Sequence, residues 1–172
     1  MQDFLSLAMS RYSCRAYAPT PVSDAQISRI LEAAKVAPTA CNLQPFRLLV
    51  LTGESLKKIE KTAWLYGAPL AIVLCTVESE AWQRKYDSQN FAVVDGAIVM
   101  THMLLEATEM GLGTCFVGAI KTPLLTEALK LDPALRPQFI MVAGHKAESE
   151  ESKPHPRHYE RKSLDDLVTY LN

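Results

Sequence analysis

The sequence predicts a β-sheet sandwiched between helices, in the α/β or α+β class. Four apolar strand-like runs are clear, and they alternate with segments of helical periodicity. The chain has 172 residues, of which 48% are hydrophobic and 22% charged, as in a globular protein with a real core. We therefore expect a single domain over residues 1–172.

The first two elements are predicted to be helices. Residues 3–10 carry apolar side chains at helical spacing. Ser23 and Gln26 have the spacing of a capping box, so we expect the second helix to begin there and to end at Pro38.

Four strands are predicted from the apolar runs. The run at 68–77 is uninterrupted and bounded by proline, which is typical of a central strand buried on both faces. The other strands are expected at 46–52, 114–117 and 138–146, with a short helix at 53–61 after the first of them. The pattern leaves open whether neighbouring strands run parallel or antiparallel.

The longest helix is predicted over residues 88–110, with Gly111 ending it. Its middle is apolar almost all round, so we expect other elements to cover most of its sides. The small residues Ala92, Gly96 and Ala97 would allow another backbone to come close.

The remaining segments are short or polar. We expect residues 78–89 to form a loop or lid and residues 123–130 a short helix. Residues 146–162 are polar, contain prolines and cannot pack alone, so they are expected to form an extended arm. A last helix is predicted at 164–171, capped by Ser163.

Charge and cysteine usage argue against several classes of function. The net charge of −1 offers no electrostatic reason to expect nucleic acid or a membrane surface as a partner. The four cysteines form no CxxC pair, which favours reduced thiols in a cytoplasmic protein over a zinc ribbon or a redox pair. The sequence shows no signal-peptide pattern and no run of roughly 18 apolar residues that could span a membrane.

Two short polar segments are candidates for a binding site. Arg11, Ser13 and Arg15 would share one face of an extended segment, where they could bind an anion such as a phosphate. Asn42 and Gln44 lie on a loop, where their carboxamides could match the donors and acceptors of a flavin ring or ribityl chain. Taken alone, each pattern is also compatible with solvated arginines or turn-forming amides.

The glycine and histidine patterns argue against a dinucleotide fingerprint and against a metal site. The glycines of 111–120 follow a helix and open a strand, which is the reverse of a dinucleotide fingerprint. Gly118 and Ala119 would instead let a flat ligand approach the backbone and its N–H groups. His155 and His158 flank a proline in a non-helical segment, so we expect no metal site there.

Taken together, these segments resemble the short, single-domain type of the FMN-dependent nitroreductase family. The similarity runs in order through RYSCRAY, PTACNLQPF, GAPLAIVLC, GLGTCFVGAI and ERKSLDDLV, and so covers most of the chain. The resemblance implies a nitroreductase-like α+β fold with a central mixed or antiparallel sheet flanked by helices. It also implies a homodimer with FMN at the interface and the long central helix within that interface.

The resemblance assigns residues to FMN and no catalytic side chain, because the hydride chemistry occurs at flavin N5. Arg11 and Ser13 match phosphate ligands, Tyr12 contributes through its main chain, and Arg15 matches the basic residue beside the N1–C2=O edge. The others are Pro38, Thr39, Asn42 and Gln44 of a loop that contributes to the pocket, with 38–42 reaching the partner's FMN, then Gly118 and Ala119 near N5, and Arg161 with Lys162 closing on the phosphate.

The implied activity is that of an FMN-dependent NAD(P)H oxidoreductase. NAD(P)H would reduce FMN and leave, and a nitroaromatic, a quinone or a similar acceptor would then take its place. The alternatives are dehalogenation, flavin cleavage, a flavin-binding homodimer without turnover, and a domain that binds another phosphorylated ligand through the same arginines. Candidates for the pocket wall are Trp64, Tyr66, Trp82 and Tyr86.

Overall fold

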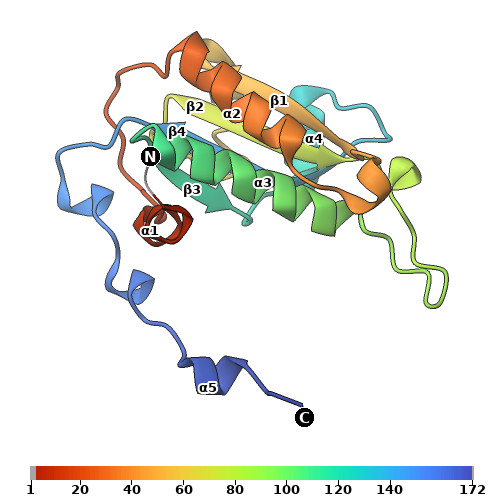
Figure 1. Ribbon diagram of the computed structural model, residues 1–172. Coiled ribbons are helices and arrows are strands. Elements are labelled where there is room, and N and C mark those ends of the chain that lie inside the picture. The colour runs from red at the N-terminus through yellow and green to blue at the C-terminus, as the bar shows by residue number, and fades with distance from the viewer. Residues whose placement is uncertain (1–2, 172) are drawn as a thin grey trace.

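The computed structural model describes residues 3–171, which form a four-stranded antiparallel sheet with helices on both faces (Figure 1). The strands are β1 (Phe46–Thr52), β2 (Leu70–Thr76), β3 (Gly113–Val117) and β4 (Arg136–Gly144), in the spatial order β1-β2-β4-β3. Every neighbouring pair is antiparallel, which decides for α+β over α/β.

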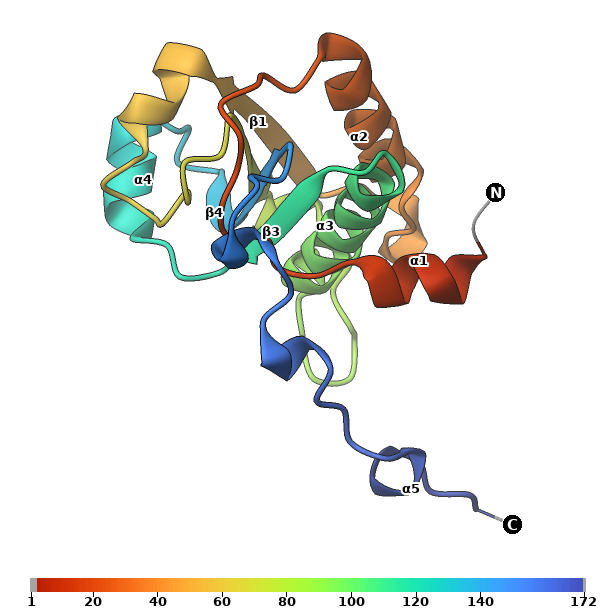
Figure 2. The same ribbon diagram turned by 90° about the vertical axis from the view of Figure 1, so that its left-hand side faces the viewer.

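Two layers of helices cover the sheet. One face carries α2 (Asp24–Val36) and α3 (Ala92–Glu109), and α1 (Phe4–Ser10) lies against α3. The opposite face is covered by the 3-10 helix η2 (Gly53–Lys58) and by α4 (Thr122–Leu129) (Figure 2).

Strand β2 lies in the centre of the molecule and is buried at every residue, as its uninterrupted apolar run predicts. Ile72 and Leu74 belong to the core beneath α2 and α3, whereas Val73 and Cys75 belong to the core on the other face. The alternation of side chains along the strand thus supplies both cores at once.

Three predicted boundaries need correction. Helix α3 begins at Ala92 instead of Ser88, because the preceding residues form a hairpin and the Asn90 side chain accepts a hydrogen bond from the Ala92 amide at 2.9 Å. Helix α5 covers only Leu164–Leu167, since Val168 is extended. The short helix after β1 ends at Lys58 instead of Lys61.

The small residues of α3 serve packing within the chain. A Cβ atom on Gly96 would lie 2.9 Å from a Leu74 methyl group, so glycine allows α3 to lie directly on β2. Ala92 is buried as well. The helix is also less covered than expected, because Val94 is 40% exposed and Thr101 is exposed.

The buried Cys75 thiol makes the stability of the fold depend on pH. Burial raises its pKa from the ordinary 9.0 to about 11, so the folded protein holds this proton more tightly than the unfolded chain does. The associated stabilisation is present below about pH 9 and is lost as the pH rises toward 11. We expect the free energy of unfolding to fall by about 2 kcal/mol more in the wild type than in Cys75→Ala between about pH 8 and about pH 10.5. Urea titrations at the two pH values measure this difference, and equal losses in both proteins would contradict the expectation.

Candidate functional site

The segment that carries Arg11, Ser13 and Arg15 is extended and lies along the edge strand β3. Ser13 forms a parallel bridge with Thr114, and the Cys14 amide donates to the Thr114 carbonyl at 2.8 Å. A Cβ atom on Gly113 would lie 2.7 Å from the Cys14 sulfur, so the close approach requires glycine.

The predicted anion-binding residues Arg11, Ser13 and Arg15 lie on a segment that runs beside Cys115 of β3, because Ser13 pairs with the neighbouring Thr114. Burial raises the pKa of the Cys115 thiol, and Arg15, the Ser13 hydroxyl and Arg11 partly offset this rise. Within residues 3–171, neither Arg11 nor Arg15 forms an ion pair with an acidic side chain. Two guanidinium groups and a hydroxyl without a carboxylate partner form a donor set that fits a phosphate.

The Tyr12 side chain contacts the C-terminal arm, which comprises residues 146–171. Its hydroxyl donates to the Ser152 carbonyl at 2.7 Å, and the Lys146 ammonium lies 5.0 Å from the centre of its ring. The main chain of Tyr12 is therefore the part that remains for a ligand.

An open groove of about 1620 Å³ begins where β3 ends, at Gly118 and Ala119. Further lining residues come from the ranges 19–27, 52–57 and 60–69. The Lys121 amide donates to the Thr62 carbonyl at 2.8 Å, and Trp64, which is 77% exposed, lines the groove together with Tyr66.

The arginine cluster, which consists of Arg11, Ser13 and Arg15, and the groove both adjoin β3. Cys115 and Val117 both belong to the core on the groove side, and Gly118 follows them. Three strand residues span about 10 Å, a distance that the ribityl chain of FMN can bridge. The sequence did not predict that residues 61–66 pair with the segment after β3, because this contact is long-range.

The loop 38–44 lies elsewhere, beside the start of α3 and at the opposite end of that helix from α1 (Figure 1). The carboxamides of Asn42 and Gln44 are exposed, as is Pro38, whereas Thr39 accepts a hydrogen bond from the Gln44 amide at 3.0 Å. Helix α3 has 18 residues and is about 27 Å long. Within one chain the loop therefore does not meet the arginine cluster.

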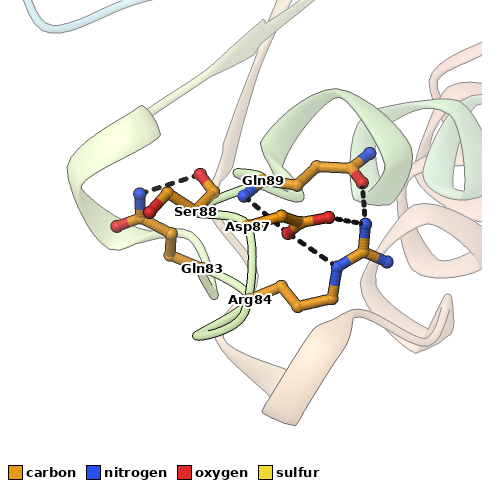
Figure 3. Close-up of polar contacts among 5 residues, drawn as sticks. All are labelled: Gln83, Arg84, Asp87, Ser88 and Gln89. Carbon is orange, nitrogen blue, oxygen red and sulfur yellow. Dashed lines mark hydrogen bonds and ion pairs between the residues drawn. The ribbon is translucent and has the colours of Figure 1, made fainter.

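Residues 81–91 form a braced hairpin where the sequence predicts a loop or lid (Figure 3). The Arg84 guanidinium donates to Asp87 at 2.8 Å and to the Gln89 side chain at 2.5 Å. Trp82 packs edge-to-face on Phe91 with ring centres 4.9 Å apart, so it belongs to the hairpin and not to the groove.

Tyr86 at the tip of this hairpin is 97% exposed and does not line the groove either. At its base the hairpin borders the loop 38–44, because the Val77 amide donates to the Pro45 carbonyl at 2.9 Å and Arg47 pairs with Glu80 at 2.7 Å.

Arg161 and Lys162 are not brought to the arginine cluster of the same chain. They lie on the C-terminal arm, which leads away from the sheet in both views (Figures 1 and 2). The Arg161 guanidinium donates to the carbonyls of Glu160 at 2.9 Å and Arg157 at 3.4 Å, both on the arm itself.

Two further findings concern residues 3–171 as a whole. They contain no helix that is long and apolar enough to cross a membrane. They also contain no cluster of three or more His, Cys, Asp and Glu side chains that could hold a metal ion.

The His102 ring, whose role the sequence leaves open, has its Nδ1 atom 2.9 Å from the Ile98 carbonyl within α3.

The sequence model of the Nitroreductase family matches residues 8–64 and 58–145. The chain belongs to the nitroreductase family. The matched ranges include the arginine cluster, the loop 38–44 and the groove, so the features described above lie within the family's own pattern.

Solved structures confirm the nitroreductase fold. A nitroreductase family protein from Clostridium difficile is 33% identical, superposes with a TM-score of 0.92, and the match covers 99% of each chain. A nitroreductase in complex with FMN from Desulfovibrio desulfuricans is 25% identical, with a TM-score of 0.80 over 100% of this chain and 99% of that one. Among curated proteins, the FMN reductase [NAD(P)H] of Bacillus subtilis is 27% identical over 100% of this chain and 76% of its own length.

Proposed function

We propose that the protein is an FMN-dependent NAD(P)H oxidoreductase that reduces nitroaromatic, quinone or similar small acceptors. The observation that carries the proposal is the position of the segment with Arg11, Ser13 and Arg15 along β3, whose end at Gly118 and Ala119 lines the groove. The FMN complex of the Desulfovibrio relative and the names of the curated relatives support the same cofactor and reductant.

Each of these residues has a distinct task under this proposal. Bound FMN supplies the hydride acceptor at N5. Arg11 and Ser13 would hold its phosphate, and Arg15 would place a positive charge beside the flavin ring, where it would favour uptake of the hydride's negative charge. The backbone N–H groups of Gly118 and Ala119 approach the edge of the ring, which small side chains permit.

We also propose that the enzyme is a homodimer in which two α3 helices face each other. The exposed face of α3 includes Val94 and Thr101 and offers an apolar contact surface. Antiparallel pairing of the two helices would bring the loop 38–44 of one subunit to the arginine cluster of the other. Pro38, Thr39, Asn42 and Gln44 would then complete the partner's site.

The C-terminal arm fits the same arrangement. Leu164 is 76% and Leu171 92% exposed, so the arm carries apolar side chains that a single chain leaves in water. Docking of the arm on a second subunit would bury them. Arg161 and Lys162 would thereby move from solvent to the phosphate at the interface.

We further propose that residues 1–172 act as one FMN-binding domain of a cytoplasmic enzyme. The free thiols of Cys14, Cys41, Cys75 and Cys115 are in keeping with a reducing compartment.

The visible spectrum of the purified protein tests the proposal. We expect the absorption of oxidised flavin, which NAD(P)H bleaches under anaerobic conditions and which a nitroaromatic or quinone then restores. A colourless protein that takes up no FMN would sink the proposal. A yellow protein that NAD(P)H does not bleach would indicate flavin binding without turnover. An acceptor screen separates nitro and quinone reduction from dehalogenation and flavin cleavage.

A further inference from the structure

Asp95 is a buried carboxylate whose hydrogen-bonding capacity is half used. It lies in the first turn of α3 and is 1% exposed. Its Oδ1 atom accepts the Ala40 amide at 2.9 Å, whereas Oδ2 is buried without a partner among residues 3–171. Burial of an incompletely bonded carboxylate is costly, and the α3 N-terminus offsets only part of this cost. The one bond that it does make therefore requires an explanation.

That bond attaches the first half of the loop 38–44 to α3. The other hydrogen bonds of the loop are local. Those from Asn42 to Thr39, from Leu43 to Ala40 and from Gln44 to Thr39 lie inside it, and the Phe46 amide at the start of β1 donates to the Gln44 carbonyl at 2.8 Å. Among residues 3–171, the bond from Ala40 to Asp95 is the one that ties this loop to an element distant in the sequence.

The loop needs such an attachment because its backbone is strained. Cys41, Asn42 and Gln44 have φ angles of 51°, 54° and 51°, in the left-handed region that non-glycine residues rarely occupy. The Asn42 and Gln44 side chains are exposed, so packing contributes little to their placement. A bond at Ala40, directly before the first strained residue, therefore sets the path of the segment.

We propose that Asp95 is a positioning residue that holds the loop 38–44 in the conformation in which Asn42 and Gln44 meet the FMN of the partner subunit. This role rests on the proposed function. Asp95 itself is covered by protein and acts through the loop backbone.

Two isosteric variants separate this role from general stability. Asp95→Leu removes the acceptor without leaving a buried charge, and Asp95→Asn keeps a carbonyl acceptor in the same place. Met103→Ala is the control, because Met103 is fully buried on the core side of the same helix and does not touch the loop's attachment.

The first measurement is amide hydrogen exchange in the FMN-free protein. In Asp95→Leu we expect the amides of Ala40, Asn42 and Leu43 to exchange at least tenfold faster than in the wild type, whereas in Asp95→Asn they stay within about threefold. Unchanged protection in Asp95→Leu would overturn the inference. This measurement requires no flavin, so it decides whether Asp95 holds the loop even if the protein takes up no FMN.

The second measurement is FMN affinity by fluorescence quenching, with the visible circular dichroism of the bound flavin. We expect Asp95→Leu to bind at least tenfold more weakly with an altered dichroism, and Asp95→Asn to stay within about threefold. Equal loss in both Asp95 variants would overturn the inference, as would equal loss in Met103→Ala at the same melting temperature. A wild type that binds no FMN would overturn the proposed function instead.

Discussion

Replacement of Arg11 by alanine is expected to lower the affinity for FMN by at least about 100-fold, which is about 2.7 kcal/mol. Arg11 is half-buried near Ser13 and Cys115 and has no carboxylate partner among residues 3–171, so a phosphate would be its principal anion. Bidentate guanidinium–phosphate contacts are among the strongest hydrogen bonds in proteins, and they are made to the one group of FMN that carries full negative charge. Fluorescence titration of the FMN-free variant measures the loss.

Lys58→Ala is the matched control for this experiment. Lys58 is an exposed cation at the end of η2 and does not line the groove, so its removal should change the affinity by less than about twofold. If Arg11→Ala were purified with its flavin still bound, the proposed phosphate site would be wrong. A loss of the same size in Lys58→Ala would mean that general electrostatics, and not a specific contact, determines binding.

Replacement of Thr101 by glutamate is expected to convert the dimer to monomers and to remove bound FMN at the same time. Thr101 lies near the middle of α3 and is exposed in the single chain, so the folded subunit tolerates a charge there. In a two-fold symmetric contact between antiparallel α3 helices, residues near the middle face their own copies, and two glutamates would be buried together. We expect the dimer dissociation constant to rise by at least about 100-fold, as measured by sedimentation, with the melting temperature of the monomer little changed.

Thr122→Glu is the control, because it makes the same chemical change away from the proposed interface. Thr122 is exposed at the start of α4, on the opposite face of the sheet from α3 (Figure 2). This variant should remain dimeric and yellow. If the Thr101→Glu protein stayed dimeric, the interface would lie elsewhere than at α3. If it were monomeric and bound FMN with unchanged affinity, the loop 38–44 of a second subunit would not be needed for FMN binding.

Local patterns predicted the secondary structure well where one residue or one period decides it. The Ser23–Gln26 capping box is present with both of its hydrogen bonds, and Gly111 ends α3 with a φ of 78°. The apolar run of β2 specifies a strand covered on both faces. The prediction of the last helix as 164–171 was wrong because Val168, Tyr170 and Leu171 are exposed, so packing against residues 3–171 does not stabilise further helix.

For the candidate site, too, local patterns predicted some features, and long-range contacts determined the others. The composition of Arg11–Arg15 indicates an anion, and Gly118–Ala119 indicates a backbone that a ligand can approach. The pairing of residues 61–66 with the segment after β3, and the attachment of the loop 38–44 to Asp95, connect residues far apart in the chain, and no local pattern encodes them.

By itself, then, the sequence determined the elements, the apolar character of the cores and the kinds of side chain that could bind a phosphorylated flavin, because these depend on neighbours within a few residues. The tertiary structure alone decided the antiparallel order β1-β2-β4-β3 and the position of the segment 11–15 along β3, whose end lines the groove. It also decided that the loop 38–44 lies at the far end of α3. These features depend on long-range packing, which places some distant segments together and keeps others about one helix length apart.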